Sequence, residues 1–157
     1  MGLYIIKKNK KILNHKYFVN SFYLPNIPYK FGKKMSLFAN AAIDISDGLF
    51  QDINHLMKNS KFAYDLDFNK IPISVNLAKY LKKNNKKKKS FVSNGDDYQI
   101  LFTASKKMKH LIKKISKSTS TKVSIVGVVK NKSISQNRKF LGEKFKFPKK
   151  LGYIHNF

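Results

Sequence analysis

Three of the eight acidic side chains in this chain fall within residues 41–53, where they flank a serine and a glycine. The stretch reads Ala-Ala-Ile-Asp-Ile-Ser-Asp-Gly-Leu-Phe-Gln-Asp-Ile. Its apolar positions recur at helical spacing from Leu49 onward, which predicts a helix that ends near Ser60. Ser46 precedes this helix, and its hydroxyl is expected to serve as the N-cap by accepting from unpaired backbone N–H groups of the first turn.

The start of such a helix attracts anions through its free N–H groups and its dipole. The carboxylates of Asp44 and Asp47 lie at the same place and would repel a phosphate, unless a hard cation sits between them. Mg²⁺ that bridges carboxylate and phosphate oxygens resolves this conflict. The alternative is that Ser46 and Asp47 only cap the helix while Asp44 is a solvated loop residue, and these residues by themselves leave both interpretations open.

A second acidic motif lies at residues 93–98, Ser-Asn-Gly-Asp-Asp-Tyr. Gly95 permits a tight turn, Asp96 and Asp97 follow it, and residues 98–104 have the composition of a strand. Taken alone, Asn-Gly-Asp-Asp is also an ordinary turn sequence.

Both motifs resemble those of one family, the thiamine-monophosphate kinases. Residues 42–49 are similar to its Ile-Asp-hydrophobic-Ser-Asp-Gly-Leu signature, and residues 93–103 are similar to its Gly-Gly-Glu-Asp-Tyr-Glu-Leu-Leu-Phe-Thr segment. Further similar segments occur in the same order along the chain: Tyr23-Leu24-Pro25 with Pro28 and Gly32, Ile125-Val126-Gly127, and the tail 152–157.

The resemblance implies transfer of the γ-phosphate of ATP to thiamine monophosphate, which gives thiamine diphosphate, with Mg²⁺ as cofactor and a homodimer as the assembly. Carried over by motif, Asp44 and Asp47 are expected to be Mg²⁺ ligands and Ser46 an ATP contact. Asp96 and Tyr153 are expected to contact the substrate.

The chain departs from the family pattern in three respects. Asp96 stands where the family has Glu, so its carboxylate reaches less far, and Asn94 replaces the first glycine of the segment. Nothing in the 157 residues corresponds to the family's N-terminal domain. We therefore expect a C-terminal-domain fragment that is inactive in isolation, with its own first strand missing and an exposed sheet edge.

The mixture of strands and helices without strict alternation predicts an α+β fold in which a mixed sheet carries packed helices. The resemblance implies the C-terminal domain of the aminoimidazole ribonucleotide synthetase superfamily, with a partly ferredoxin-like topology. A single domain is expected over residues 1–157, with a helix and a proline- and aromatic-rich connection in 1–38 and the main body in 39–157.

Within these regions the patterns predict specific elements. Helices are expected at residues 1–12, ended by Asn14 and His15, at 74–83, and after Ser105 with a buried stripe. Strands are expected at 62–68, 98–104 and 122–129, with weaker signals at 133–134 and 140–141. Asp65 and Asp67 are expected on a solvated strand face without chemistry, and the lysine-rich run 82–89 is expected to be a solvated linker.

The formal net charge is +25, from 33 basic residues, and would ordinarily suggest nucleic acid as a partner. Arg138 is the only arginine, however, and the lysines are spread over every segment. Such a composition resembles the coding bias of an A/T-rich genome, so nucleic-acid binding is the less favoured alternative. A superfamily relative that uses ATP on another acceptor is the other alternative.

The chain contains no cysteine, which excludes disulfides and thiolate chemistry and is compatible with a reducing cytoplasm. No apolar run approaches the roughly 20 residues that a membrane-spanning helix requires. The apolar patch near the N-terminus precedes its lysines instead of following them, so no signal peptide is indicated. We expect a cytoplasmic protein without a membrane partner.

Overall fold

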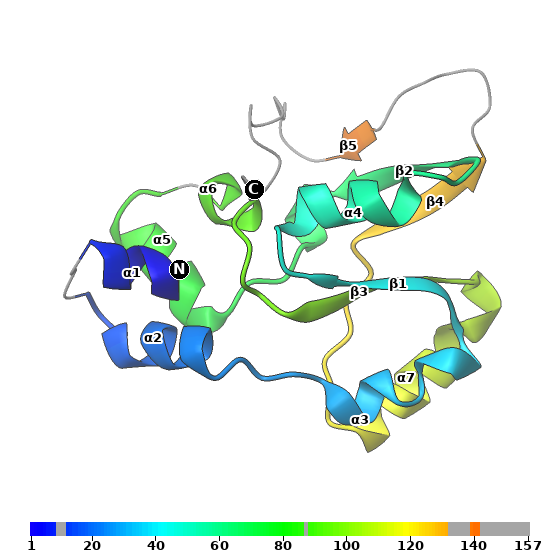
Figure 1. Ribbon diagram of the computed structural model, residues 1–157, viewed down its shortest axis with the longest axis horizontal. Coiled ribbons are helices and arrows are strands. Elements are labelled where there is room, and N and C mark those ends of the chain that lie inside the picture. The colour runs from blue at the N-terminus through cyan, green and yellow to red at the C-terminus, as the bar shows by residue number, and fades with distance from the viewer. Residues whose placement is uncertain (9–11, 87, 132–138, 142–157) are drawn as a thin grey trace, which may run out of the picture.

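The computed structural model describes residues 1–8, 12–86, 88–131 and 139–141 and shows an α+β architecture (Figure 1). The helices are α1 (Gly2–Lys7), α2 (His15–Tyr23), α3 (Tyr29–Gly32), α4 (Leu49–Met57), α5 (Val75–Lys83), α6 (Lys89–Val92) and α7 (Lys109–Ser118). The strands are β1 (Ala39–Ile45), β2 (Phe62–Asp67), β3 (Gln99–Ala104), β4 (Gly127–Asn131) and β5 (Lys139–Leu141). Short 3₁₀ turns lie at Met35–Leu37, Phe68–Lys70 and Lys106–Met108. The predicted fold class is confirmed.

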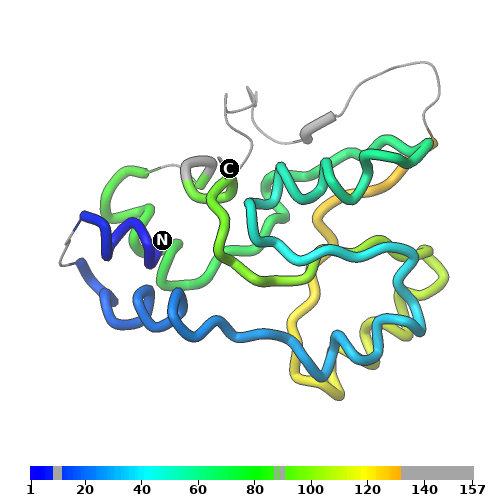
Figure 2. Tube along the Cα trace, viewed as in Figure 1, coloured from blue at the N-terminus to red at the C-terminus, as the bar shows by residue number. Residues whose placement is uncertain are grey.

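The strands form two sheets instead of the one mixed sheet that the sequence predicted. β1 and β3 pair antiparallel, with Ile45 opposite Gln99 at the end of β1. The second sheet has the order β4-β2-β5, in which β4 is antiparallel and β5 parallel to β2. Helix α4 connects β1 of the first sheet to β2 of the second sheet, and its path can be followed in the trace of Figure 2.

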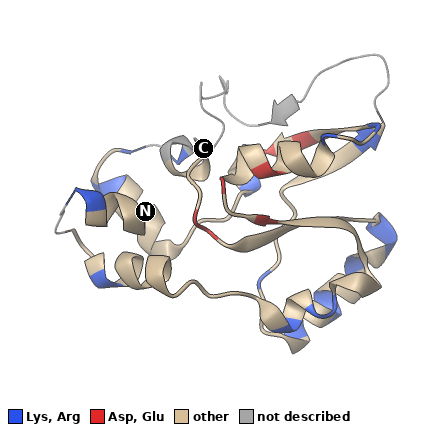
Figure 3. Cartoon of the chain, viewed as in Figure 1, with Lys and Arg blue, Asp and Glu red and all other residues tan. Residues whose placement is uncertain are grey.

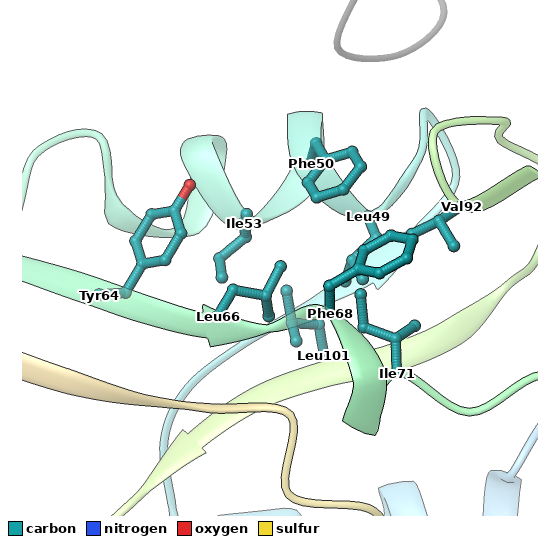
Figure 4. Packing of buried hydrophobic residues seen from close by; sticks show 9 residues of the cluster. All are labelled: Leu49, Phe50, Ile53, Tyr64, Leu66, Phe68, Ile71, Val92 and Leu101. Carbon is teal, nitrogen blue, oxygen red and sulfur yellow. The ribbon is translucent and has the colours of Figure 1, made fainter. Parts of the chain in front are cut away.

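The larger hydrophobic cluster joins the two sheets through α4 (Figure 4). Phe50 and Leu66 are almost fully buried in it, and Leu101 reaches it from β3. Burial of one such side chain contributes about 2 kcal/mol to stability. The cluster consists of Leu49, Phe50, Ile53, Tyr64, Leu66, Phe68, Ile71, Val92 and Leu101.

A smaller cluster packs on the opposite face of the β1–β3 pair. Phe31 and Phe38 are buried against Phe102, with ring centroids 5.9 and 5.4 Å from it. Since Leu101 and Phe102 are adjacent on β3, they point to opposite faces, and each serves a different cluster. The stripe predicted after Ser105 belongs to this smaller cluster and is confirmed: Met108 in the preceding 3₁₀ turn, and Leu111, Ile112 and Ile115 in α7.

The N-terminal region differs from the expectation of one helix followed by a connection. α1 ends at Lys7, and His15, predicted to end a helix, instead begins α2. The first proline of the connection is Pro25, so nothing in residues 15–23 interrupts a helix. α2 ends where Leu24 precedes this proline and has left the helical region, as the steric clash with a following proline requires.

The prediction of a solvated carboxylate face on β2 is wrong for Asp65. This side chain is buried and forms an ion pair with Lys130. Lys130 lies diagonally across the β2–β4 ladder on the same face, because Asp65 pairs directly with Val128. Asp67 is only half-buried and pairs with Lys70 at 2.8 Å.

β4 begins at Gly127, later than the strand predicted from Lys122. A Cβ atom at Gly127 would lie 2.2 Å from the carbonyl oxygen of Asp65, which no side chain tolerates. The glycine therefore marks a close backbone approach between β4 and β2.

Within the part of the chain that the structure describes, β5 confirms the weak strand signal at 140–141, and no helix is both long and apolar enough to cross a membrane. The signal at 133–134 and the tail 151–157 lie outside the described residues.

The prediction of a solvated linker over residues 82–89 is wrong at Lys88. Its ammonium group donates to the carbonyl oxygens of Phe68 at 2.9 Å, Asn69 at 3.4 Å and Ile71. It also lies 5.1 Å from the centre of the Phe68 ring. Removal from water lowers the pKa of Lys88, and the charge of Asp67 opposes this effect. One lysine of the run thus ties the start of α6 to the turn after β2.

We expect Lys88→Ala to lower the free energy of unfolding by about 2 kcal/mol, because three carbonyl oxygens lose a charged donor. The neighbouring Lys86→Ala is the matched control, since Lys86 is exposed and lies in the same lysine run. Urea unfolding followed by circular dichroism measures both variants. Equal stability of the two would show that the Lys88 contacts contribute nothing.

Candidate functional site

The two acidic motifs lie against each other in the fold. Because β1 runs antiparallel to β3, the chain that leaves β1 meets the chain that enters β3. Two backbone hydrogen bonds continue the pairing beyond the strands: the N–H of Asp96 donates to Ser46 at 2.8 Å, and that of Tyr98 donates to Ile45 at 2.9 Å. In Figure 3 acidic segments gather where β1 ends, where α4 begins and in the loop before β3. We call residues 44–48 the first loop and residues 93–98 the second loop.

The N-terminus of α4, which follows the first loop, is capped in a way that the sequence did not predict. The N-cap of α4 is Gly48, and the Ser46 hydroxyl makes no capping hydrogen bond to the helix, so that prediction is wrong. Instead the carboxylate of Asp52, on the first turns of α4, accepts from the N–H of Asp47 at 3.2 Å and of Gly48 at 3.0 Å. This is the reach-back of a capping box, made here by a residue one position further into the helix.

Asp52 is nearly inaccessible to solvent, with 2% of its surface exposed. Burial raises its pKa, the donation from Gly48 opposes that rise, and the charge of Asp47 adds to it. The Asp47 carboxylate in turn accepts from the side-chain amide of Gln51 at 3.1 Å. Both the backbone and the side chain of Asp47 are therefore held by residues of α4.

Asp47, Asp52 and His55 place one potential ligand atom each within 4.8 Å of one another, which among the described residues is the group whose spacing suits a metal ion. Asp44 is not part of this group, although the sequence paired it with Asp47. The oxygen of Asp52 that contributes to the loop cap is already shared by two N–H donors. Asp47 is the member of this group that the sequence also predicted as a Mg²⁺ ligand.

Asp44 lies on β1 opposite Ile100, with its side chain exposed. Its charge contributes to raising the pKa of Tyr98, although the charge of Asp96, burial and a hydrogen bond contribute more. That bond runs from the Tyr98 hydroxyl to Asp96 at 3.3 Å. Carboxylates of the two motifs therefore act on the same phenol.

The second loop holds two residues other than glycine in the left-handed backbone region. φ is +63° at Asp96 and +49° at Tyr98. Such conformations cost about 1 kcal/mol or more each, and they persist only where surrounding contacts impose them. Here the two hydrogen bonds to the first loop impose them.

Of the predicted site residues, Asp44, Ser46, Asp47 and Asp96 are brought together, whereas Tyr153 lies outside the described residues. Sequence reasoning gave no role to Asp52 and Gln51. The available signal was an acidic residue early in the helix, on the same side as the apolar positions. An acid placed there is buried, so it must find donors in the loop.

No family model matches the chain. A search of curated proteins finds thiamine-monophosphate kinase of Buchnera aphidicola subsp. Schizaphis graminum, 36% identical over 94% of this chain and 45% of the relative. The same kinase of B. aphidicola subsp. Acyrthosiphon pisum is 33% identical over 82% of this chain and 40% of the relative. The chain thus spans less than half the length of these relatives.

Solved structures of the same kinase are also similar to this chain. AaThiL complexed with AMPPCP and TMP matches with a TM-score of 0.75 and 25% identity, over 98% of this chain and 47% of that chain. The kinase of Stenotrophomonas maltophilia matches in fold with a TM-score of 0.75, at 23% identity and over 90% of this chain and 46% of that chain. The fold is thus the one found in these solved kinase structures. The chain belongs to the thiamine-monophosphate kinase family.

The cap made by Asp52 generates a stability prediction. Asp52→Ala leaves the N–H groups of Asp47 and Gly48 without their acceptor and is expected to cost about 2 kcal/mol. Asp52→Asn keeps an acceptor oxygen and is expected to cost less. Thermal unfolding of both variants at neutral pH gives the comparison, and a larger loss in Asp52→Asn than in Asp52→Ala would contradict the cap.

The Asp52 variants should also change how the free energy of unfolding depends on pH. In the folded protein the pKa of Asp52 lies above its ordinary value of 3.8, so the folded state holds this proton more tightly. The contribution of Asp52 to stability therefore falls as the pH rises from the unfolded pKa through the folded one. Asp52→Asn should lack this fall.

Proposed function

We propose that this chain takes part in the ATP-dependent phosphorylation of thiamine monophosphate to thiamine diphosphate. The observation that carries the proposal is the hydrogen-bonded contact between the first loop and the second loop. The first loop carries the residues expected to bind Mg²⁺ and ATP, and the second carries the residue expected to bind the substrate. Positioning of the two reactants, together with neutralisation of phosphate charge by the metal, supplies most of the catalysis in phosphoryl transfer.

Asp44 and Asp47 are proposed to hold Mg²⁺, and Ser46 to contact ATP. The donor set suits this ion, because Mg²⁺ prefers carboxylate oxygens together with phosphate oxygens. Bound there, Mg²⁺ would neutralise charge on the ATP phosphates. The chain's own contribution is to orient Asp47, whose carboxylate is held by Gln51 and whose N–H is held by Asp52.

Asp96 and Tyr153 are proposed to contact thiamine monophosphate. Asp96 is shorter by one methylene than the Glu of the family motif, and its backbone N–H is tied to Ser46. The Tyr98 hydroxyl donates to the Asp96 carboxylate and holds it in place. The neighbour complexed with AMPPCP and TMP supports the choice of these two ligands for a shared site.

The finer architecture is also a proposal. Residues 1–157 are proposed to form one domain, with 1–38 leading into the main body 39–157, of the C-terminal kind in the aminoimidazole ribonucleotide synthetase superfamily. The partly ferredoxin-like topology, the homodimer and the cytoplasmic location remain predictions of the family resemblance. Within the described residues β1 has β3 as its one strand partner, which accords with the expected open edge.

The metal assignment is tested with Asp44→Asn and Asp47→Asn. Each variant is expected to lower Mg²⁺-dependent affinity for AMPPCP by about tenfold or more, because a neutral amide binds Mg²⁺ far less well than a carboxylate. Isothermal titration calorimetry with and without Mg²⁺ measures this. Asp67→Asn is the matched control, an acidic residue paired with Lys70 on the other sheet. Unchanged affinity in both test variants would overturn the assignment.

The substrate assignment is tested with Asp96→Asn. The variant is expected to weaken binding of thiamine monophosphate by about tenfold, as loss of a charged hydrogen-bonding partner costs about 1.5–3 kcal/mol. Binding of AMPPCP with Mg²⁺ measured in parallel shows whether the effect is confined to the substrate. Loss of nucleotide affinity alone would move Asp96 to the nucleotide site instead.

A further inference from the structure

Two glycines face the backbone of the opposite loop at distances that exclude any side chain. A Cβ atom at Gly95, in the second loop, would lie 2.1 Å from the Ser46 oxygen and 3.1 Å from the Asp47 carbonyl carbon. A Cβ atom at Gly48, in the first loop, would lie 2.6 Å from the Ser93 oxygen. Real Cβ atoms essentially never approach other atoms within 3.0 Å, so each loop lies where the other would carry a side chain.

The two glycines are required for different reasons. Gly48 has a φ of +124°, a region that residues with side chains rarely adopt, so it is needed for its conformation as well as for space. Gly95 has no positive φ, and therefore it is needed only because the first loop lies so close. A substitution at Gly95 thus tests the contact between the loops alone, because it forces no side chain into a left-handed backbone conformation.

The contact is backed by two directional bonds from residues that follow Gly95. The N–H of Asp96, the next residue, donates to the same Ser46 oxygen that approaches Gly95. The N–H of Tyr98 donates to Ile45. An alanine at residue 95 would have to move the Ser46 carbonyl by about 1 Å to reach a normal contact, and these hydrogen bonds would lengthen or break.

We propose that Gly95 is a positioning residue for both ligands: its missing side chain lets the second loop seat on Ser46 and Asp47, so that the two loops form one rigid unit. The proposal rests on the proposed function for the identity of the ligands, but the contact itself does not. It predicts that a side chain at residue 95, in the second loop, weakens binding at the first loop as well.

The test variant is Gly95→Ala, and the chain offers two matched controls. Gly127→Ala introduces a clash of the same size, 2.2 Å from the Asp65 oxygen, in the β4–β2 ladder away from both loops. Gly32→Ala meets only the Ile100 side chain at 3.6 Å, an ordinary contact. The first control reports what a backbone clash does to stability, and the second reports what an added methyl group does.

The first measurement is hydrogen exchange of the full chain without ligand, read at the amides of Asp96 and Tyr98. Gly95→Ala should lose protection at both amides, whereas Gly127→Ala and Gly32→Ala should retain it after correction for global stability. Retained protection in Gly95→Ala, or an equal loss in Gly127→Ala, would overturn the proposal.

The second measurement is the affinity for AMPPCP with Mg²⁺ and, separately, for thiamine monophosphate. Gly95→Ala should weaken both by about tenfold or more, the usual effect of losing a residue that supports a ligand group. Gly127→Ala should weaken neither at a temperature where it is folded. An effect on thiamine monophosphate alone would refute the rigid unit. If the unchanged chain binds neither ligand, the proposed function fails, while the exchange measurement still decides whether Gly95 seats the two loops.

Discussion

The antiparallel pairing of β1 with β3 is the constraint on which the rest of the site depends. The two motifs are distant in sequence, and this pairing brings the end of one strand beside the start of the other. Its register, with Ile45 opposite Gln99, is what allows Asp96 and Tyr98 to donate to the first loop. A shift of one residue would turn each side chain to the other face of the pair, and both hydrophobic clusters would be lost with it.

Those clusters hold the register in place. Leu101 packs toward α4 and the second sheet, and Phe102 packs toward α3 and α7, so each face of a two-stranded ladder is covered. A two-stranded sheet by itself is marginally stable in water, and here it gains its stability from the elements packed on both of its faces. The packing core and the candidate site are therefore joined by the same two strands.

Two charged side chains, the buried Asp52 and the half-buried Lys88, hold backbone groups in place. Asp52 holds the N–H groups of the first loop, and Lys88 holds carbonyl groups after β2. Each satisfies backbone groups that would otherwise be costly to bury. The chain has 33 basic and eight acidic side chains, and most of its lysines are exposed, whereas Lys88 makes specific contacts with backbone carbonyl groups.

The sequence alone determined the two motifs, the stripe of α7 and the helix after residue 48, because helical periodicity and short motifs are local properties of the chain. It misplaced the cap of α4, the exposure of Asp65 and the role of Lys88, since each of these depends on a partner that folding brings from elsewhere. Which of many lysines finds carbonyl groups, and which glycine meets another loop, follows from strand register and packing. Only the tertiary structure decided that the two acidic motifs lie against each other, because their contact exists once β1 and β3 are paired.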